Sequence, residues 1–180
     1  MEEKVILVDK NDNTIGTMSK LDAHKQGKLH RALSVFIFND NDEFLLQKRA
    51  LDKYHSPGLW SNTCCSHPRK DELVSKAAER RLFEEMGIKT SLEKIFHFKY
   101  KVKFENGLIE NEFDHVFCGK YNGSPNINVL EVSDWKWMSF KEIKKDLIEN
   151  SGRYTFWFKL IFDNFLEKLK IKIWKLQLVE

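Results

Sequence analysis

Residues 72–88 read ELVSKAAERRLFEEMGI, and their apolar spacing is typical of a helix. Asp71 stands just before this stretch, where its side chain could cap the first turn, and Gly87 follows the last turn, where a left-handed residue is favoured. These signals predict a helix over residues 72–86. Because no repeat and no linker rich in Pro, Gly or Ser interrupts the chain, we expect one domain over residues 1–180.

The predicted helix carries two opposite charges on its face of small residues. At about 100° per residue, Arg81 and Glu85 fall on the same stripe as Val74, Ala77 and Ala78. Burying a charge is costly unless the charge is paired or coordinates something. The stripe therefore indicates either an internal ion pair or a functional site, and the helix alone favours neither.

Strand-forming segments lie on both sides of this helix. Four apolar, β-branched or aromatic segments precede it, at residues 5–8, 14–18, 32–38 and 44–48. After it, residues 95–104 alternate as in a half-buried strand, and Asn106-Gly107 predicts a hairpin turn into a returning strand over residues 108–118. The remaining predicted elements are one strand and two helices, at residues 135–137, 140–148 and 154–169. Without regular βαβ alternation, these elements predict an α+β fold of mixed sheets flanked by helices.

The returning strand places three acids, Glu110, Glu112 and Asp114, on one face. A row of acids ordinarily faces solvent. The other face is apolar as well, however, because it carries Ile109, Phe113 and Phe117. Neither face is therefore assigned to solvent.

The composition excludes several classes of protein. There are 30 basic and 27 acidic residues, and the formal charge of +3 does not indicate nucleic acid or an anionic membrane as partner. Three cysteines, two of them adjacent, cannot form a disulfide framework, and the first residues lack the apolar run of a signal peptide. No apolar run reaches the ~18 residues of a membrane span. We expect a cytoplasmic, monomeric protein without stable membrane insertion, and assign no role to its lysine-rich end after Leu169.

Cys65 is a candidate reactive thiol. It is expected in a loop just before a helix N-terminus, a setting that lowers a thiol pKa and keeps the sulfur accessible. The alternative is that Cys64 and Cys65 are small buried apolar residues. In an extended segment the two side chains would point in opposite directions, one inward and the other toward a cleft.

Histidines and acids could form a metal site if the fold brings them together. His24, His30 and His67 lie in polar connections or at strand starts, and with Glu110 and Glu112 they would suit a divalent transition metal. A structural or exposed role is the more usual one for a single histidine. Five cations could bind a phosphorylated ligand or be ordinary surface charges, namely Lys20, Arg49, Lys53, Arg69 and Arg81.

Several motifs occur in the order found in one enzyme family. They are residues 20–24, 29–30, 47–50, 57–60, 63–68, 78–81 and 109–112. Over nearly the whole chain this pattern resembles the type 1 isopentenyl diphosphate isomerases, a family of the Nudix superfamily. The Nudix box itself is present in altered form, with its frame kept by Glu72, Arg80, Leu82, Glu84, Glu85, Gly87 and Ile88.

Two departures from the Nudix box bear on the reaction. Ser66 replaces the leading glycine, and Arg81 replaces an acid that helps to bind metal in the hydrolases. The resemblance therefore implies an isomerase that leaves its diphosphate intact, with Arg81 binding the diphosphate and Glu85 helping to hold a bridging magnesium ion. A Nudix-type diphosphate hydrolase is the first alternative, and a non-catalytic metal-binding module is the second.

The resemblance also implies ligands and catalytic roles. It assigns zinc, manganese or magnesium to His24, His30, His67, Glu110 and Glu112, and it implies no flavin. It assigns the substrate diphosphate to Lys20, Arg49, Lys53 and Arg81. Cys65 and Glu112 would lie on opposite faces of the substrate alkene, with Tyr100 close to Glu112 and Trp157 closing the pocket. Moving the double bond from isopentenyl to dimethylallyl diphosphate then requires a proton donor, Glu112 with Tyr100, and an acceptor, Cys65.

The hairpin register bears directly on the role of Tyr100. A two-residue turn at Asn106-Gly107 would pair Tyr100 with Phe113, which would place Tyr100 and Glu112 on opposite faces. We therefore predict a longer or bulged connection that shifts the register by one residue.

Overall fold

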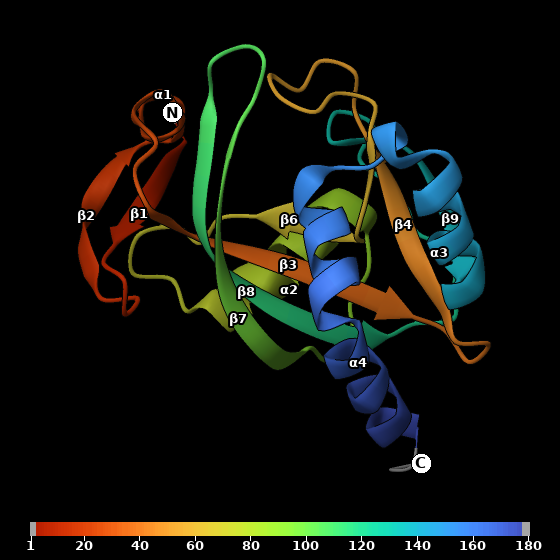
Figure 1. Cartoon of the computed structure of the whole chain (residues 1–180). Helices are drawn as coiled ribbons and strands as arrows, with labels where there is room; N and C mark the ends of the chain where they lie inside the picture. Colours follow the sequence, from red (N-terminus) through yellow and green to blue (C-terminus); the bar gives the residue numbers. More distant parts are fainter. Residues whose placement is uncertain (1–2, 178–180) are drawn as a thin grey trace.

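The computed structural model describes residues 3–177 and the side chains of residues 3–170, so most of the lysine-rich end lies outside the described side chains. Its strands are β1 Lys4–Val8, β2 Thr14–Ser19, β3 His30–Phe38, β4 Glu43–Arg49, β5 Trp60–Ser61, β6 Cys64–Ser66, β7 Glu93–Lys103, β8 Ile109–Lys120 and β9 Val132–Ser139. Its helices are α1 Lys20–Gln26, α2 Val74–Met86, α3 Phe140–Glu149, the short 3₁₀ helix η1 Ser151–Arg153 and α4 Phe156–Gln177. Mixed strands flanked by helices confirm the predicted α+β fold (Figure 1). Among the described residues, no helix combines the length and apolar character that crossing a membrane requires.

Strand β3 organises the sheet. It pairs in parallel with β8 over its whole length and antiparallel with β6 on its other side. The first ladder places His30 opposite Glu112, and the second places Ser34 opposite Cys65. The candidate metal ligand Glu112 and the candidate thiol Cys65 therefore lie on the two strands next to β3.

Strands β3 and β4 open away from each other. Their ladder consists of the pair Phe38 and Phe44, next to the turn that joins them, and beyond it the strands diverge (Figure 1). The diverging part of β4 pairs with β9 and with the short strand β5. This opening positions the cavity described below.

Alternating side chains of β3 contribute to two cores. Phe36 and Phe38 belong to the buried cluster that α4 completes with Phe158, whereas Leu33 and its neighbours on the other face pack in the cluster completed by Leu82 of α2. In Figure 1, α4 lies in front of the sheet and α2 behind it. Each large side chain buried in this way stabilises the fold by about 1.5–3 kcal/mol.

The structure corrects the predicted start of the central helix. α2 begins at Val74, and its N-cap residue Leu73 makes no side-chain capping hydrogen bond. Asp71 adopts a left-handed conformation with φ 63°, so its predicted capping role is wrong. The predicted helix end is confirmed, because Gly87 has φ 68° and a Cβ there would lie 2.7 Å from the Asn126 carbonyl oxygen.

Helix α1 forms where the sequence predicts only a polar connection. The Ser19 hydroxyl accepts a hydrogen bond from the Asp22 N–H at 3.2 Å, and Gly27 ends the helix with φ 60°. The helix places Lys20 and His24 one turn apart on the same side. A cation and a candidate metal ligand are thereby brought together.

The β7–β8 hairpin has the predicted shifted register. Tyr100 pairs with Glu112, and the ladder closes where the Phe104 N–H donates to the Leu108 carbonyl at 2.8 Å. Residues 105–107 therefore form a three-residue loop, with φ 82° at Gly107. The longer connection predicted from the sequence is confirmed.

Candidate active site

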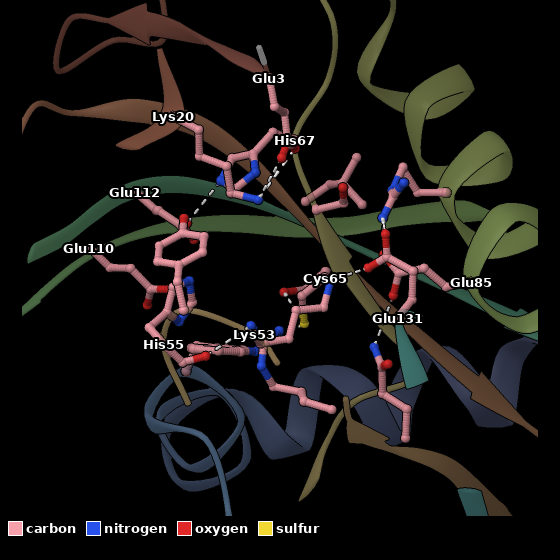
Figure 2. A pocket seen from close by; sticks show the side chains of 18 of the residues that line it. Glu3, Lys20, Lys53, His55, Cys65, His67, Glu85, Glu110, Glu112 and Glu131 are labelled. Carbon is pink, nitrogen blue, oxygen red and sulfur yellow. Dashed lines mark hydrogen bonds and ion pairs between the residues drawn. The ribbon is translucent and has the colours of Figure 1, made fainter. Parts of the chain in front are cut away.

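A cavity of about 350 Å³ lies in the opening between β3 and β4. Most residues implicated by the sequence line it, namely Lys20, Arg49, Lys53, Cys65, His67, Arg81, Glu85, Tyr100, Glu110, Glu112 and Trp157. Figure 2 shows Cys65 between an end formed by His67 and Glu112 and an end formed by Glu85 and Glu131. Arg69 does not line the cavity, and its side chain is 69% exposed.

Three imidazoles and one carboxylate converge at the first end. His24, His30, His67 and Glu112 each offer a ligand atom, and these atoms all lie within 4.8 Å of one another. The Nε2 atoms of His24 and His30 are 3.2 Å apart, and Glu112 Oε1 lies 3.2 Å from His67 Nε2 and 3.5 Å from His30 Nε2. The β3–β8 ladder supplies two of the four groups, and α1 and the segment after β6 supply the others.

The electrostatics of this group suit a divalent cation. Burial lowers the pKa of His24 to about 3 and that of His67 to about 4, so both imidazoles are neutral and can offer a lone pair. Burial alone would raise the pKa of Glu112, but the adjacent imidazoles of His30 and His67 hold it well below its usual range. Neutral imidazoles with one ionised carboxylate are donors that divalent transition metals accept.

Glu110 lies beside this group rather than within it. Its Oε1 is 3.4 Å from His55 Nε2, and its Oε2 is 3.0 Å from the Tyr100 hydroxyl. Burial, and then the charge of Glu112, raise the pKa of Glu110 well above its usual range. Tyr100 also donates to Glu112 Oε2 at 2.7 Å, so one phenol connects the two carboxyl groups.

Cys65 lies on strand β6, with its sulfur in a set of specific contacts. The Trp157 Nε1–H donates to the sulfur at 2.9 Å, and the thiol donates to Asn62 Oδ1 at 2.9 Å. Cys64 is fully buried and packs in the opposite core, on the α2 side. The predicted opposite orientation of the adjacent cysteines is confirmed.

The expected lowering of the Cys65 pKa is wrong. Burial, and then the nearby charge of Asp114, raise the pKa of the Cys65 thiol to about 12. Cys65 belongs to a strand, and α2 begins only at Val74, whereas a helix dipole acts mainly within its first turn. The thiol is therefore protonated in the free protein.

The second end of the cavity holds the anomalous charges of α2. Arg81 Nη2 lies 2.7 Å from Glu85 Oε1 and 3.3 Å from Glu131 Oε1, and Lys53 also pairs with Glu131. Gln47 donates to the other oxygen of Glu85 at 3.1 Å. The buried Nε of Arg81 has no hydrogen-bond partner among the described residues. The two opposite charges predicted on one face of the helix, Arg81 and Glu85, thus form an internal ion pair that lines the cavity.

Two further cations complete this lining. Arg49 donates to the backbone carbonyls of Ser56 and His55 at 3.1 and 3.2 Å, and its guanidinium lies 5.4 Å from the Trp157 ring centre. Lys20 Nζ pairs with Glu3 at 3.1 Å. Arg49 is therefore held by neutral carbonyls and a ring, which leaves its charge for an anion.

Two curated proteins of similar sequence identify the family of this chain. The chain is 51% identical to "Isopentenyl-diphosphate Delta-isomerase 2" of Aromatoleum aromaticum, over 91% of this chain and 86% of the relative. It is 47% identical to the protein of the same name in Photorhabdus laumondii, over 97% of this chain and 98% of the relative. The chain belongs to the isopentenyl-diphosphate Delta-isomerase family. The resemblance noted in the sequence is thereby confirmed.

The isomerase also belongs to a wider structural family. Residues 28–158 match the NUDIX domain family. Solved structures of DR0079 from Deinococcus radiodurans and of a MutT protein from Methanosarcina mazei have TM-scores of 0.69 and 0.65. They cover 82% and 79% of this chain, and this chain covers 90% and 96% of theirs, at 16% and 19% identity. At such identities the likeness shows the fold of the isomerase alone.

Sequence reasoning missed two residues of the isomerase site and the hydrogen-bond partner of one buried acid near it. Tyr54 and His55 lie in the loop between β4 and β5, where polar composition gave no signal, and both line the cavity. Asp114 was recognised as one of three acids on one face of a strand, but its hydrogen-bond partner was not predicted. Ser34 donates to Asp114 Oδ2 at 2.7 Å across the parallel β3–β8 ladder, a pairing that single-strand periodicity cannot reveal.

Proposed function

We propose that this isomerase interconverts isopentenyl diphosphate and dimethylallyl diphosphate through a tertiary carbocation. The observation that carries the proposal is one cavity that contains both a thiol, Cys65, and a carboxyl–phenol pair, Glu112 with Tyr100. Cys65 and Glu112 stand on the strands flanking β3, and Tyr100 stands on β7 beside Glu112, so a flat alkene between the thiol and the carboxyl–phenol pair could be approached from two sides. Migration of a double bond needs such an arrangement, because one carbon gains a proton while another loses one.

The proton balance assigns a role to each group. Toward dimethylallyl diphosphate, the Glu112–Tyr100 pair gives the proton that the Tyr100 phenol carries to the terminal methylene carbon, and the positive charge forms on the tertiary carbon. Cys65 accepts a proton from the methylene group next to that carbon, which closes the new double bond. Burial raises the pKa of Cys65, whereas the Ser61 hydroxyl contact to sulfur and the charge of Arg49 lower it and so favour the thiolate that an acceptor requires. In the reverse direction the roles are exchanged.

A divalent metal would be held by His24, His30, His67 and Glu112, with Glu110 as a further ligand. Such an ion supplies positive charge that tunes proton transfer at Glu112. Zinc, manganese and magnesium are all compatible with this set of nitrogen and oxygen donors. We assign a second ion, magnesium, to Glu85 together with the substrate diphosphate.

The diphosphate would occupy the cationic end of the cavity. Arg81 offers its unpartnered Nε, and Arg49 offers a guanidinium that is held by carbonyls. Lys20 and Lys53 would exchange their pairing with Glu3 and Glu131 for phosphate oxygens. Because Arg81 stands where a Nudix hydrolase has an acid, the site binds the diphosphate without cleaving it.

Trp157 would protect the carbocation. Its ring is 3% exposed, and its indole N–H also donates to Ser61. An aromatic face stabilises a desolvated cation by about 2 kcal/mol. Exclusion of water by the same ring prevents capture of the intermediate.

The proposed context is a cytoplasmic monomer acting on a small diphosphate within isoprenoid biosynthesis. A formal charge of +3, from nearly equal numbers of acids and bases, supports the absence of a nucleic-acid partner. We also propose that residues 1–180 form one domain, since the described elements share one connected sheet.

A deuterium experiment tests the reaction. The protein is incubated with isopentenyl diphosphate and a divalent metal in deuterated water, and the products are followed by NMR. We expect dimethylallyl diphosphate that carries deuterium. Release of phosphate would instead identify a hydrolase, and an unchanged substrate would indicate a binding module.

A further inference from the structure

Tyr54 connects the metal-binding group to the loop that carries substrate-binding residues. Its hydroxyl lies 2.6 Å from His24 Nδ1, on the side of the imidazole away from the convergence point. Tyr54 belongs to the segment between β4 and β5, where its neighbours Lys53 and His55 line the cavity. One hydrogen bond therefore joins two parts of the site that come from distant stretches of sequence.

The hydrogen bonds of His30 fix the side of the ring that faces the cluster. His30 Nδ1 lies 2.8 Å from the Lys28 carbonyl oxygen. A carbonyl can only accept, so Nδ1 carries a proton, and in a ring with a single proton Nε2 offers its lone pair. This lone pair faces His24 Nε2 at 3.2 Å.

His24 has two consistent arrangements, and the Tyr54 hydroxyl serves both. Without a cation, His24 Nε2–H donates to His30, and Nδ1 accepts from the Tyr54 O–H. With a cation at the convergence point, Nε2 must offer its lone pair, so the proton sits on Nδ1 and the Tyr54 oxygen must accept it. A hydroxyl can do both because it rotates about its C–O bond, whereas a carbonyl or an ammonium group could serve only one arrangement.

The backbone of Tyr54 is also held in place. Asn106, at the turn of the β7–β8 hairpin, donates to the Tyr54 carbonyl at 3.1 Å. Lys20, one helical turn before His24, places its Nζ 5.8 Å from the centre of the Tyr54 ring. The side chain remains 42% exposed, so these polar contacts rather than deep burial determine its position.

We propose that Tyr54 is a positioning residue that orients His24 in both tautomers and couples metal occupancy to the order of the loop over residues 50–59. The coupling arises because a bound cation polarises the His24 Nδ1–H, so the hydrogen bond to the Tyr54 oxygen is stronger with metal than without it. This inference rests on the proposed function, because the loop presents Lys53 to the diphosphate. Coupling between two sites is reciprocal, so metal tightens the binding of the diphosphate and the diphosphate tightens the binding of metal by the same factor.

The test uses the full chain with Tyr54→Phe, which keeps the ring and removes the hydroxyl. Zn²⁺ and Mn²⁺ are each titrated in competition with a chelator, without substrate. Loss of an outer hydrogen-bond partner typically weakens metal binding by about 10–100-fold, and we expect that loss here. Tyr121→Phe is the matched control, because its hydroxyl donates to the Ser124 carbonyl outside the cavity, and it should bind metal as the native protein does.

Two further measurements separate positioning from a general structural effect. Nitrogen NMR of His24 should show the Nε2–H tautomer without metal and the Nδ1–H tautomer with Zn²⁺. Hydrogen exchange over residues 50–59 should slow on addition of Zn²⁺ in the native protein and much less in Tyr54→Phe.

Each result bears on the proposal separately from the reaction. Native metal affinity in Tyr54→Phe, or one unchanged His24 tautomer, would overturn the positioning role. Equal slowing of exchange in both proteins would overturn the coupling to the loop. Because none of these measurements uses substrate, a failure of the isomerase assay would count against the proposed function without altering them.

Discussion

Glu112 uses its two carboxylate oxygens for different partners. Oε1 faces His67 and His30 at 3.2 and 3.5 Å, whereas Oε2 accepts from Tyr100 at 2.7 Å. One side chain can therefore bind a metal and exchange a proton without changing its rotamer. The register of the β7–β8 hairpin fixes this division, because it places Tyr100 directly opposite Glu112.

Removing either member of the acid–base pair should nearly abolish turnover. General acid or base catalysis contributes about 10²–10⁴-fold, so Cys65→Ala and Glu112→Gln should each lower kcat by at least that order. Cys64→Ala is the control, because Cys64 packs in the opposite core and should change kcat little. Steady-state kinetics measure all three variants, and full activity in Cys65→Ala would contradict the mechanism.

Alkylation of Cys65 should report its raised pKa. Because burial raises that pKa to about 12, the thiolate fraction should rise about tenfold per pH unit from pH 7 to 10 without a plateau. The rate of modification by iodoacetamide, followed at Cys65 by mass spectrometry, measures this fraction. In urea the same cysteine should level off near pH ~9. A plateau of the modification rate between pH 7 and 10 in the folded protein would count against the assigned pKa of about 12.

At the scale of elements, the β7–β8 loop determines whether the site is complete. Three residues, 105–107, separate the paired residues Phe104 and Leu108, so the side chains of Tyr100 and Glu112 share a face. A change of one residue in the register would turn every side chain of one strand to the other face. The hairpin therefore affects the chemistry from outside the cavity.

Deletion of Glu105 should preserve activity, whereas loss of the Tyr100 hydroxyl should not. After the deletion, Asn106-Gly107 would form a two-residue turn between Phe104 and Leu108, so Tyr100 would still pair with Glu112. We therefore expect near-native kcat in the deletion variant. Tyr100→Phe keeps the ring but removes the proton-transfer partner, and it should lower kcat by about 10²-fold or more with a far-UV circular dichroism spectrum close to native. Native kcat in Tyr100→Phe would mean that the Tyr100 hydroxyl is not needed.

Several elements could be predicted from local signals, and the exceptions have physical reasons. The alternation of residues 95–104 identifies β7, because its period of two reflects one buried face. The signals for α1 were present in Ser19, Asp22 and Gly27, but the helix has only seven residues, too short for a clear apolar period. Asp71 has the right residue type for a cap but the wrong backbone conformation, and the residue type alone does not reveal that difference.

At the scale of the whole molecule, the cavity concentrates charge where the fold would otherwise bury apolar groups. Asp114 illustrates the cost, because it is 1% exposed and one of its oxygens has no hydrogen-bond partner among the described residues. Burial, and then the charge of Glu112, raise the pKa of Asp114 to about 8. Such groups reduce the stability of the fold in a way that depends on pH.

Asp114→Asn should stabilise the protein more at high pH than at low pH. The folded pKa of about 8 lies above the unfolded value of ~3.9, so the favourable protonated state is complete below pH ~4. Stability is then lost as the pH rises toward 8. We expect a gain of roughly 1–3 kcal/mol in the free energy of unfolding at pH 8 and little at pH 4, measured by urea titration. An equal gain at both pH values would refute the assignment.

The candidate site could be predicted only where residues matched a family pattern. Cys65 and Glu112 have no distinguishing local signal, and they meet because β6 and β8 flank β3. Tyr54 was missed because its role depends on a contact with His24 across the fold. These site residues are brought together by strand pairing and loop contacts between distant parts of the sequence, which composition and periodicity do not reveal.

The ladders around β3 also fix the spacing of the strands that carry the site. Neighbouring strands are about 4.8 Å apart, so β6 and β8 run roughly 10 Å from each other on the two sides of β3, with Cys65 opposite Ser34 and Glu112 opposite His30. Backbone hydrogen bonds set this width, and no single side chain can adjust it. An engineer seeking room for a bulkier alkene should therefore alter the β4–β5 loop and α4, which bound the slot from outside, and leave the sheet untouched.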